Sequence, residues 1–155
     1  MTDGIERALA AHHRFEEQDD GFVPTRTTFD ATVQVGSEAV RVESEVPTLD
    51  AVVTGETVAP VVEDGWFETF ERRVEDVGGV TKAEDASVTD VVRGVDTVSV
   101  YTELRPTPGT AAEDVVAVVS YVEGTWMEGI IPGYDYVDRV QRLRDQARQN
   151  AQSPS

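Results

Sequence analysis

Alternating apolar and polar residues mark a first pair of strands in the chain. Residues 29–35 and 40–46 both repeat an apolar side chain at nearly every second position, which is the period of a strand with one buried face. Gly36-Ser37 between them fits a two-residue type II′ turn, which has glycine at its first position. This turn would pair Val33 with Val40 and place both apolar sets on one face of the sheet. We therefore predict a β-hairpin here.

A second pair of strands is predicted at residues 87–93 and 97–104, because residues 97–104 alternate throughout. Phe22-Val23 is compatible with a short neighbouring strand. The pattern is weaker over residues 47–62, where Pro60 is unsuited to a central strand. For that stretch we predict one short strand or an extended crossing.

Apolar spacings of three and four residues predict four helices. In the predicted helix at residues 64–77, Trp66, Phe67 and Phe70 form an aromatic stripe. We interpret this stripe as part of the core; an aromatic binding box is the alternative. Asp64 is the predicted cap of this helix. The predicted helices are a first one that fades near Phe15, followed by 64–77, 110–131 and 136–151.

Residues 110–131 contain the longest apolar run in the chain. Thr110 and Glu113 have the spacing of a capping box, in which each side chain accepts a hydrogen bond from the other residue's backbone N–H. Pro132-Gly133 would end the helix. A strand is the alternative for residues 115–122, which are rich in β-branched valine. The whole run is too long for a usual strand, so we predict a helix.

The predicted elements follow in the order α-β-β-(β)-α-β-β-α-α. Helices and hairpins come in blocks instead of strict alternation, which is typical of the α+β class. We expect an antiparallel sheet of about five strands with helices packed on one face. We expect a single domain over residues 1–151 and a disordered tail over residues 152–155.

Charge is the strongest compositional signal. The chain has 30 acidic residues against 13 basic ones, for a net charge of −17, and Lys82 is its single lysine. The acids are spread along the whole sequence, so they repel one another at ordinary ionic strength. At about 1 M salt the Debye length falls to about 3 Å and most of this repulsion is screened. Dispersed acid with almost no lysine is typical of a cytoplasmic protein from a salt-accumulating halophilic archaeon.

Composition also narrows the classes of function. The chain has no cysteine, so disulfides and thiolate metal sites are absent. We expect no signal peptide, because the N-terminal segment is polar, and no membrane partner, because no apolar run is long enough to span a bilayer. The acidic charge argues against nucleic acid as a partner.

No motif in the sequence indicates a cofactor. The phosphate-loop, dinucleotide, nucleophile-elbow and zinc-protease patterns are all missing. His12 and His13 precede Glu16 and Glu17 by four residues, so on a helix these pairs would face each other. They could form a metal or acid–base site, or merely exposed pairs at a helix end; adjacent histidines point in different directions, which favours exposed pairs. We expect no metal, cofactor or catalytic residue.

Two segments resemble an uncharacterised domain family of halophilic archaea. They are Glu63–Thr69 and residues 123–134, of which the run Gly129–Tyr134 (GIIPGY) is the most distinctive part. The resemblance extends over most of the chain and implies no known activity. The order of elements is also similar to the fold shared by type III secretion chaperones and YbjN-like proteins, an analogy of fold that does not determine function.

These observations favour a small non-catalytic binding or adaptor protein over an enzyme. The candidate interaction surface is Tyr134 and Tyr136 together with Arg139 and Arg142, because tyrosine and arginine are enriched at protein interfaces. The partner would be another protein or a second copy. In the alternative interpretation the turn only reverses the chain, with Tyr134 packed on the core. Two further alternatives are an enzyme with a metal-assisted site near His12 and His13, and nucleic-acid binding through the arginines of the last helix, which are Arg139, Arg142, Arg144 and Arg148.

Overall fold

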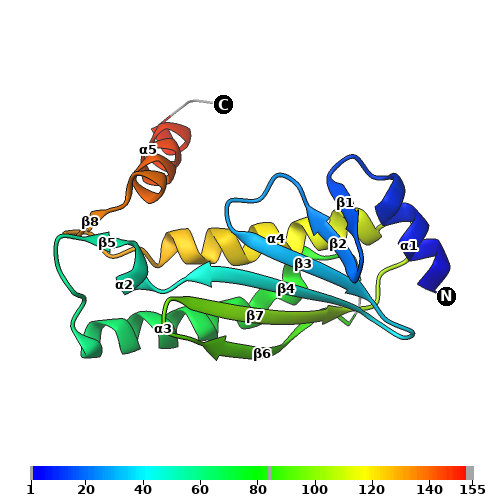
Figure 1. Ribbon diagram of the computed structural model, residues 1–155, viewed down its shortest axis with the longest axis horizontal. Helices are drawn as coiled ribbons and strands as arrows, with labels where there is room; N and C mark the ends of the chain where they lie inside the picture. Colours follow the sequence, from blue (N-terminus) through cyan, green and yellow to red (C-terminus); the bar gives the residue numbers. More distant parts are fainter. Residues whose placement is uncertain (1, 84, 153–155) are drawn as a thin grey trace.

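The structure is a computed structural model that describes the backbone of residues 2–83 and 85–152 and the side chains of residues 4–83 and 85–146. Strands and helices alternate in blocks along the chain, as Figure 1 shows. The elements are α1 (Thr2–Ala11), β1 (Phe15–Gln18), β2 (Gly21–Pro24), β3 (Asp30–Val35), β4 (Val40–Pro47), α2 (Leu49–Val52), β5 (Val53–Thr54), α3 (Pro60–Val74), the 3-10 helix η1 (Glu75–Val80), β6 (Ser87–Arg93), β7 (Thr97–Leu104), α4 (Ala111–Glu128), β8 (Asp135–Tyr136) and α5 (Asp138–Gln152).

Six strands form one sheet in the order β1-β2-β3-β4-β7-β6, and every neighbouring pair is antiparallel. This confirms the α+β class with an antiparallel sheet, but the sheet has six strands where about five were predicted. The optional strand predicted within residues 47–62 is not part of this sheet, whereas β2, at the possible short strand Phe22-Val23, is. Strand β1 was not predicted, because its residues begin where the first helix was expected to fade. Phe15 is its single buried residue, so its sequence FEEQ lacks the alternation that identifies longer strands.

Helix α4 packs along the sheet, and α1 and α3 lie on the same side of it (Figure 1). The covered face of the sheet carries buried valines, whereas the opposite face carries polar side chains such as Arg41 and Glu43. No helix in the described part of the chain is long and apolar enough to cross a membrane. The fully buried valines of β4, β7 and α4 are Val40, Val42, Val46, Val98, Val100, Val115, Val118 and Val122.

The predicted hairpin forms, but its predicted register is wrong by two residues. Val33 pairs with Val42, and Val35 with Val40, around a four-residue loop closed by a 2.9 Å hydrogen bond from Gly36 N–H to the Ala39 carbonyl. A type II′ turn needs a positive φ at its first central position, and Gly36 does not have one. Because side chains alternate with a period of two, the shift leaves the same residues on the buried face.

The central helix is confirmed as a helix over residues 111–128, including the segment 115–122 for which a strand was the alternative. Its predicted capping box is not formed, because Thr110 has φ −116° and ψ −4° instead of the extended backbone of a capping residue. The Thr110 N–H instead closes a turn onto the Thr107 carbonyl at 3.1 Å. The start of the helix was therefore predicted correctly for a reason that does not hold.

Helix α3 begins four residues earlier than predicted. Pro60 occupies its first turn, where the missing N–H has no helical partner to lose, and Ala59 is the N-terminal flanking residue. Asp64 consequently lies inside the helix and pairs with Arg93 at 3.0 Å instead of capping it. The aromatic stripe is confirmed as core, since Trp66 and Phe70 are buried.

Residues 47–62 contain one short strand, as predicted, but also helical segments, which were not predicted. They contain the short helix α2, the two-residue strand β5 and the start of α3. The Thr48 side chain accepts a hydrogen bond from Ala51 N–H and caps α2. The last helix begins at Asp138 instead of residue 136, because Tyr136 is in β8, which pairs with β5. Of the predicted disordered tail, residue 152 belongs to α5, and residues 153–155 lie outside the described residues.

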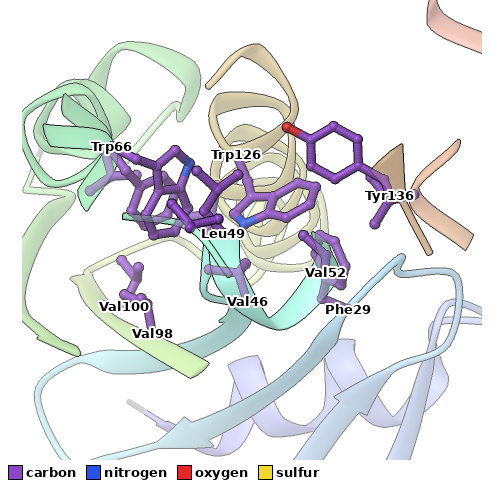
Figure 2. Packing of buried hydrophobic residues seen from close by; sticks show 14 residues of the cluster. Phe29, Val46, Leu49, Val52, Trp66, Val98, Val100, Trp126 and Tyr136 are labelled. Atoms are coloured by element: carbon purple, nitrogen blue, oxygen red, sulfur yellow. The ribbon is translucent and has the colours of Figure 1, made fainter. Parts of the chain in front are cut away.

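Trp126 joins three parts of the structure. It is completely buried, and its Nε1–H donates a 2.8 Å hydrogen bond to the Pro47 carbonyl at the end of β4. Its ring meets that of Phe29 edge to face, with centroids 4.9 Å apart. Figure 2 shows it between Val46 and Leu49 on one side and Tyr136 on the other. Trp126 thereby connects α4 to the central sheet and to the C-terminal segment.

We expect Trp126→Phe to lower the free energy of unfolding by about 2–4 kcal/mol, because it leaves a cavity and an unpaired Pro47 carbonyl. Urea denaturation at molar KCl would measure the change. Tyr121→Phe is the control, since the Tyr121 hydroxyl bonds the Arg73 carbonyl in an exposed position. Equal losses in the two variants would contradict a special role for Trp126.

Strands β2 and β3 meet closely at one position. One pair of residues, Phe22 and Val33, lies in register between the two strands. A Cβ atom on Gly21 would lie 2.1 Å from the Val33 carbonyl oxygen, and Gly21 also has a φ of +154°. Only glycine therefore fits at the start of β2 without moving one strand away from the other.

Gly21→Ala should destabilise the fold by about 1–3 kcal/mol, because the added methyl group overlaps the backbone of β3. Gly65→Ala is the matched control: Gly65 is exposed in α3, and a Cβ there meets nothing within 4 Å. That control should stabilise the protein by up to about 1 kcal/mol. Thermal or urea unfolding that gave the two variants the same sign would refute this account.

Candidate interaction surface

The C-terminal segment is attached to the rest of the protein through β8. After α4 the chain turns at Gly133, whose φ is +102°, a conformation that favours glycine. Tyr136 then pairs with Val53 of β5, and the Val137 N–H donates a 2.9 Å hydrogen bond to the Val52 carbonyl. These bonds determine where α5 begins, and α5 stands off from the sheet at this end of the molecule (Figure 1).

The two tyrosines of the predicted surface pack inward to different degrees. Tyr136 is only 6% exposed, and its hydroxyl donates to the Ile131 carbonyl. Burial raises the pKa of the Tyr136 hydroxyl above its ordinary value, against the opposing effects of that hydrogen bond and of Arg144. Tyr134 is half-buried and packs against the same core, with its ring centroid 6.5 Å from that of Tyr136. Tyr136 is therefore a core residue that supports the surface from beneath.

Two arginines of α5 lie over aromatic rings. The Arg139 guanidinium carbon is 5.3 Å from the centroid of Phe29, and that of Arg144 is 5.3 Å from the centroid of Tyr136. Such cation–π contacts hold a guanidinium in place without neutralising it. Arg142 is exposed and contacts no ring within the described part of the chain.

Helix geometry places Arg139 and Arg142 next to each other. They are three residues apart, a spacing at which side chains are neighbours on a helix surface. Val140 is completely buried, and at about 100° per residue Arg142 lies about 200° around the helix from it. Arg142 consequently faces away from the body of the protein. We call the exposed pair Arg139 and Arg142 the arginine ridge.

Neither arginine of the arginine ridge forms an ion pair with an acid among the described side chains. Asp135 and Asp138 precede Arg139 and Arg142 by four residues, a spacing that would favour ion pairs on a helix. Neither pair forms among the described side chains, the first because Asp135 lies in β8 and not on a helix. By sequence, α5 carries four arginines and two aspartates, a net charge of +2, in a protein of net charge −17. Among the described side chains the ion pairs are Lys82–Glu113, Arg93–Asp64 and Arg105–Asp85.

Glu123 supports the ridge from the core side. Its Oε2 accepts a 2.8 Å hydrogen bond from the Phe29 N–H, which fixes the ring that lies under Arg139. Burial raises the pKa of this half-buried carboxyl above its ordinary value, while hydrogen bonds from the backbone of Phe29 and Thr28 act in the opposite direction. Glu123 and Phe29 were not predicted as parts of this surface. Both lie far from Arg139 in the sequence, so no local pattern links them to it.

The histidine hypothesis is not supported by the geometry. Helix α1 ends at Ala11, so Glu16 and Glu17 lie in β1 and do not face His12 and His13 across a helical turn. The two imidazole rings stack at 4.7 Å, and His12 Nδ1 accepts from the Arg14 N–H. Within the described residues no three histidine or acidic side chains converge as metal ligands would.

The fold and this surface define an acidic α+β domain with a six-stranded antiparallel sheet and a cationic C-terminal helix. Residues 10–146 match a family of unknown function, DUF5813. The chain belongs to this family, which accords with the uncharacterised domain family that the sequence resembles. A search of curated proteins found no match.

The raised pKa of Glu123 predicts a pH dependence of stability. The folded protein binds the proton of Glu123 more tightly than the unfolded chain does. Raising the pH from the pKa of the unfolded state through the pKa of the folded state therefore lowers the stability of the fold. The difference in free energy of unfolding between the wild type and Glu123→Gln should therefore decrease as the pH rises. The decrease should begin near the ordinary pKa of glutamate.

Urea denaturation across this pH range in molar KCl would measure the effect. Glu68→Gln is the control, since it removes an exposed carboxylate of α3 and the same unit of charge. If the wild type gains stability relative to Glu123→Gln as the pH rises, the interpretation of this carboxyl is wrong.

Proposed function

We propose that the protein is a non-catalytic binding protein of a halophilic archaeal cytoplasm, and that the arginine ridge with the half-buried Tyr134 is its docking surface. The observation that carries this proposal is an exposed pair of arginines that form no ion pair with any described side chain, in a protein that has 30 acidic residues. Unpaired arginines beside tyrosine are the side chains that most often contribute binding energy at protein interfaces.

The partner that this surface fits is an acidic protein. Salt-adapted proteins carry dense negative charge, and a guanidinium can bind a carboxylate through two parallel hydrogen bonds. At molar salt the long-range repulsion between acidic molecules is screened, whereas pairs in direct contact are affected much less. A small cationic helix on an acidic protein would then determine where the two molecules meet.

The similar order of elements in type III secretion chaperones and YbjN-like proteins remains a prediction from sequence. It is compatible with a protein-binding role. Nucleic acid fits the surface less well, because the protein outside α5 holds nine basic and 28 acidic residues and would repel a phosphate backbone.

Affinity capture from a lysate kept at molar KCl tests the proposal. We expect the Arg139→Ala/Arg142→Ala variant to capture at least tenfold less of the partner than the wild type does. Mass spectrometry would identify and quantify the captured protein. The matched control is Arg7→Ala/Arg41→Ala, which removes the same charge from exposed arginines elsewhere, one of them stacked on Tyr101. Circular dichroism would confirm that both variants fold.

Two outcomes would contradict the proposal. Equal capture by the ridge variant and the control would remove the ridge from the docking surface. Retention of the wild type on DNA or RNA that weakens with added salt, and is lost in the ridge variant, would establish a nucleic-acid partner instead.

A further inference from the structure

A groove runs between α4 and the end of α3 with η1, on the helical side of the protein. Its volume is about 460 Å³. Asp76 from η1 and Glu128 from α4 line it, both of them exposed. Neither carboxylate forms an ion pair with the described side chains. Arg73 is the one basic residue among the groove's lining residues, so the lining has a net charge of −1.

Gly124 lies in this groove, and no contact inside the chain requires a glycine there. It is exposed in the middle of α4, and a Cβ atom at this position would meet nothing within 4 Å. Glycine in an exposed helix interior costs about 1 kcal/mol relative to alanine. What glycine provides is room for another chain to approach the helix backbone closely.

Tyr121 gives the groove an aromatic wall. Its hydroxyl donates a 2.8 Å hydrogen bond to the Arg73 carbonyl, which holds the ring in position. Arg139 and Arg144 already lie over aromatic rings within their own molecule, and the exposed Arg142 does not. The groove thus offers carboxylates and a tyrosine ring, which are the groups that bind a guanidinium.

We propose that the arginine ridge of one molecule binds in this groove of a second copy of the same chain. This inference rests on the proposed docking surface and names its partner. Arg142 faces away from its own body, so its guanidinium is directed toward another molecule. Because each copy has one ridge and one groove, a two-fold symmetric dimer forms the contact twice. Asp76 and Glu128 of each copy then neutralise Arg139 and Arg142 of the other.

Charge reversal in both halves of the contact tests this dimer. Sedimentation equilibrium in molar KCl should give the wild type twice the chain mass of 16.9 kDa. The variants Arg139→Glu/Arg142→Glu and Asp76→Arg/Glu128→Arg should each be monomeric under the same conditions. In each of them the dissociation constant of the dimer should rise at least tenfold. An equimolar mixture of the two variants should recover a dimer, because both contacts then regain opposite charges.

Gly124→Gln provides a second variant that is independent of charge. It fills the groove with a side chain that favours the helix, so it should remove the dimer without lowering the melting temperature. Arg7→Glu/Arg41→Glu is the control for charge reversal and should remain dimeric.

The results separate this inference from the proposed function. A wild type that is monomeric at molar salt, or variants that leave the dimer unchanged, would overturn the dimer. If a different protein is nevertheless captured through Arg139 and Arg142, the proposed function stands without it. A monomer that captures nothing through the ridge would overturn both.

Discussion

The hydrogen bond from Trp126 to the Pro47 carbonyl is the constraint on which the arrangement of this protein depends. A layer of valines sets the distance between α4 and the sheet, but apolar contacts are non-directional and leave the helix free to shift along the sheet. The indole N–H removes that freedom, because a buried donor must keep its acceptor. The same ring contacts Phe29, so the position of α4 also determines where the aromatic support for Arg139 lies.

The C-terminal helix reverses the charge character of the rest of the protein. Elsewhere the surface is dominated by carboxylates, which keep a protein hydrated and separate from its neighbours at high salt. On α5 the guanidinium groups of Arg139 and Arg144 lie over the rings of Phe29 and Tyr136, which belong to the core, so these two positive charges are held in fixed positions. A rigid cation loses less conformational entropy on binding than a flexible one, which favours arginine over lysine for this task.

The sequence predicted what depends on periodicity and missed what depends on long-range contacts. The strands at 87–93 and 97–104, the helical stripe of Trp66 and Phe70, and the start of the central helix were all confirmed. Turn geometry was less predictable, because the backbone of residues 36–39 and of Thr110 is determined by how flanking elements meet.

The candidate surface was predictable only in part. Arginines and tyrosines near the C-terminus were visible as interface-type residues. That Tyr136 is buried follows from its pairing with β5, which no local pattern reveals. The acidic groove on the helices was also hidden, since dispersed acids carry no information until the fold brings particular ones together.

The single register pair between β2 and β3 has a consequence for motion. Hydrogen bonds elsewhere in the sheet form long ladders, so those strands can separate only when much of the core opens. The β1–β2 hairpin forms one register pair with β3, and three of its eight residues are buried. We therefore expect its detachment to cost less free energy than global unfolding. The exposed edge of β3 then becomes transiently available, and the dense negative charge of the chain opposes pairing of that edge with another molecule.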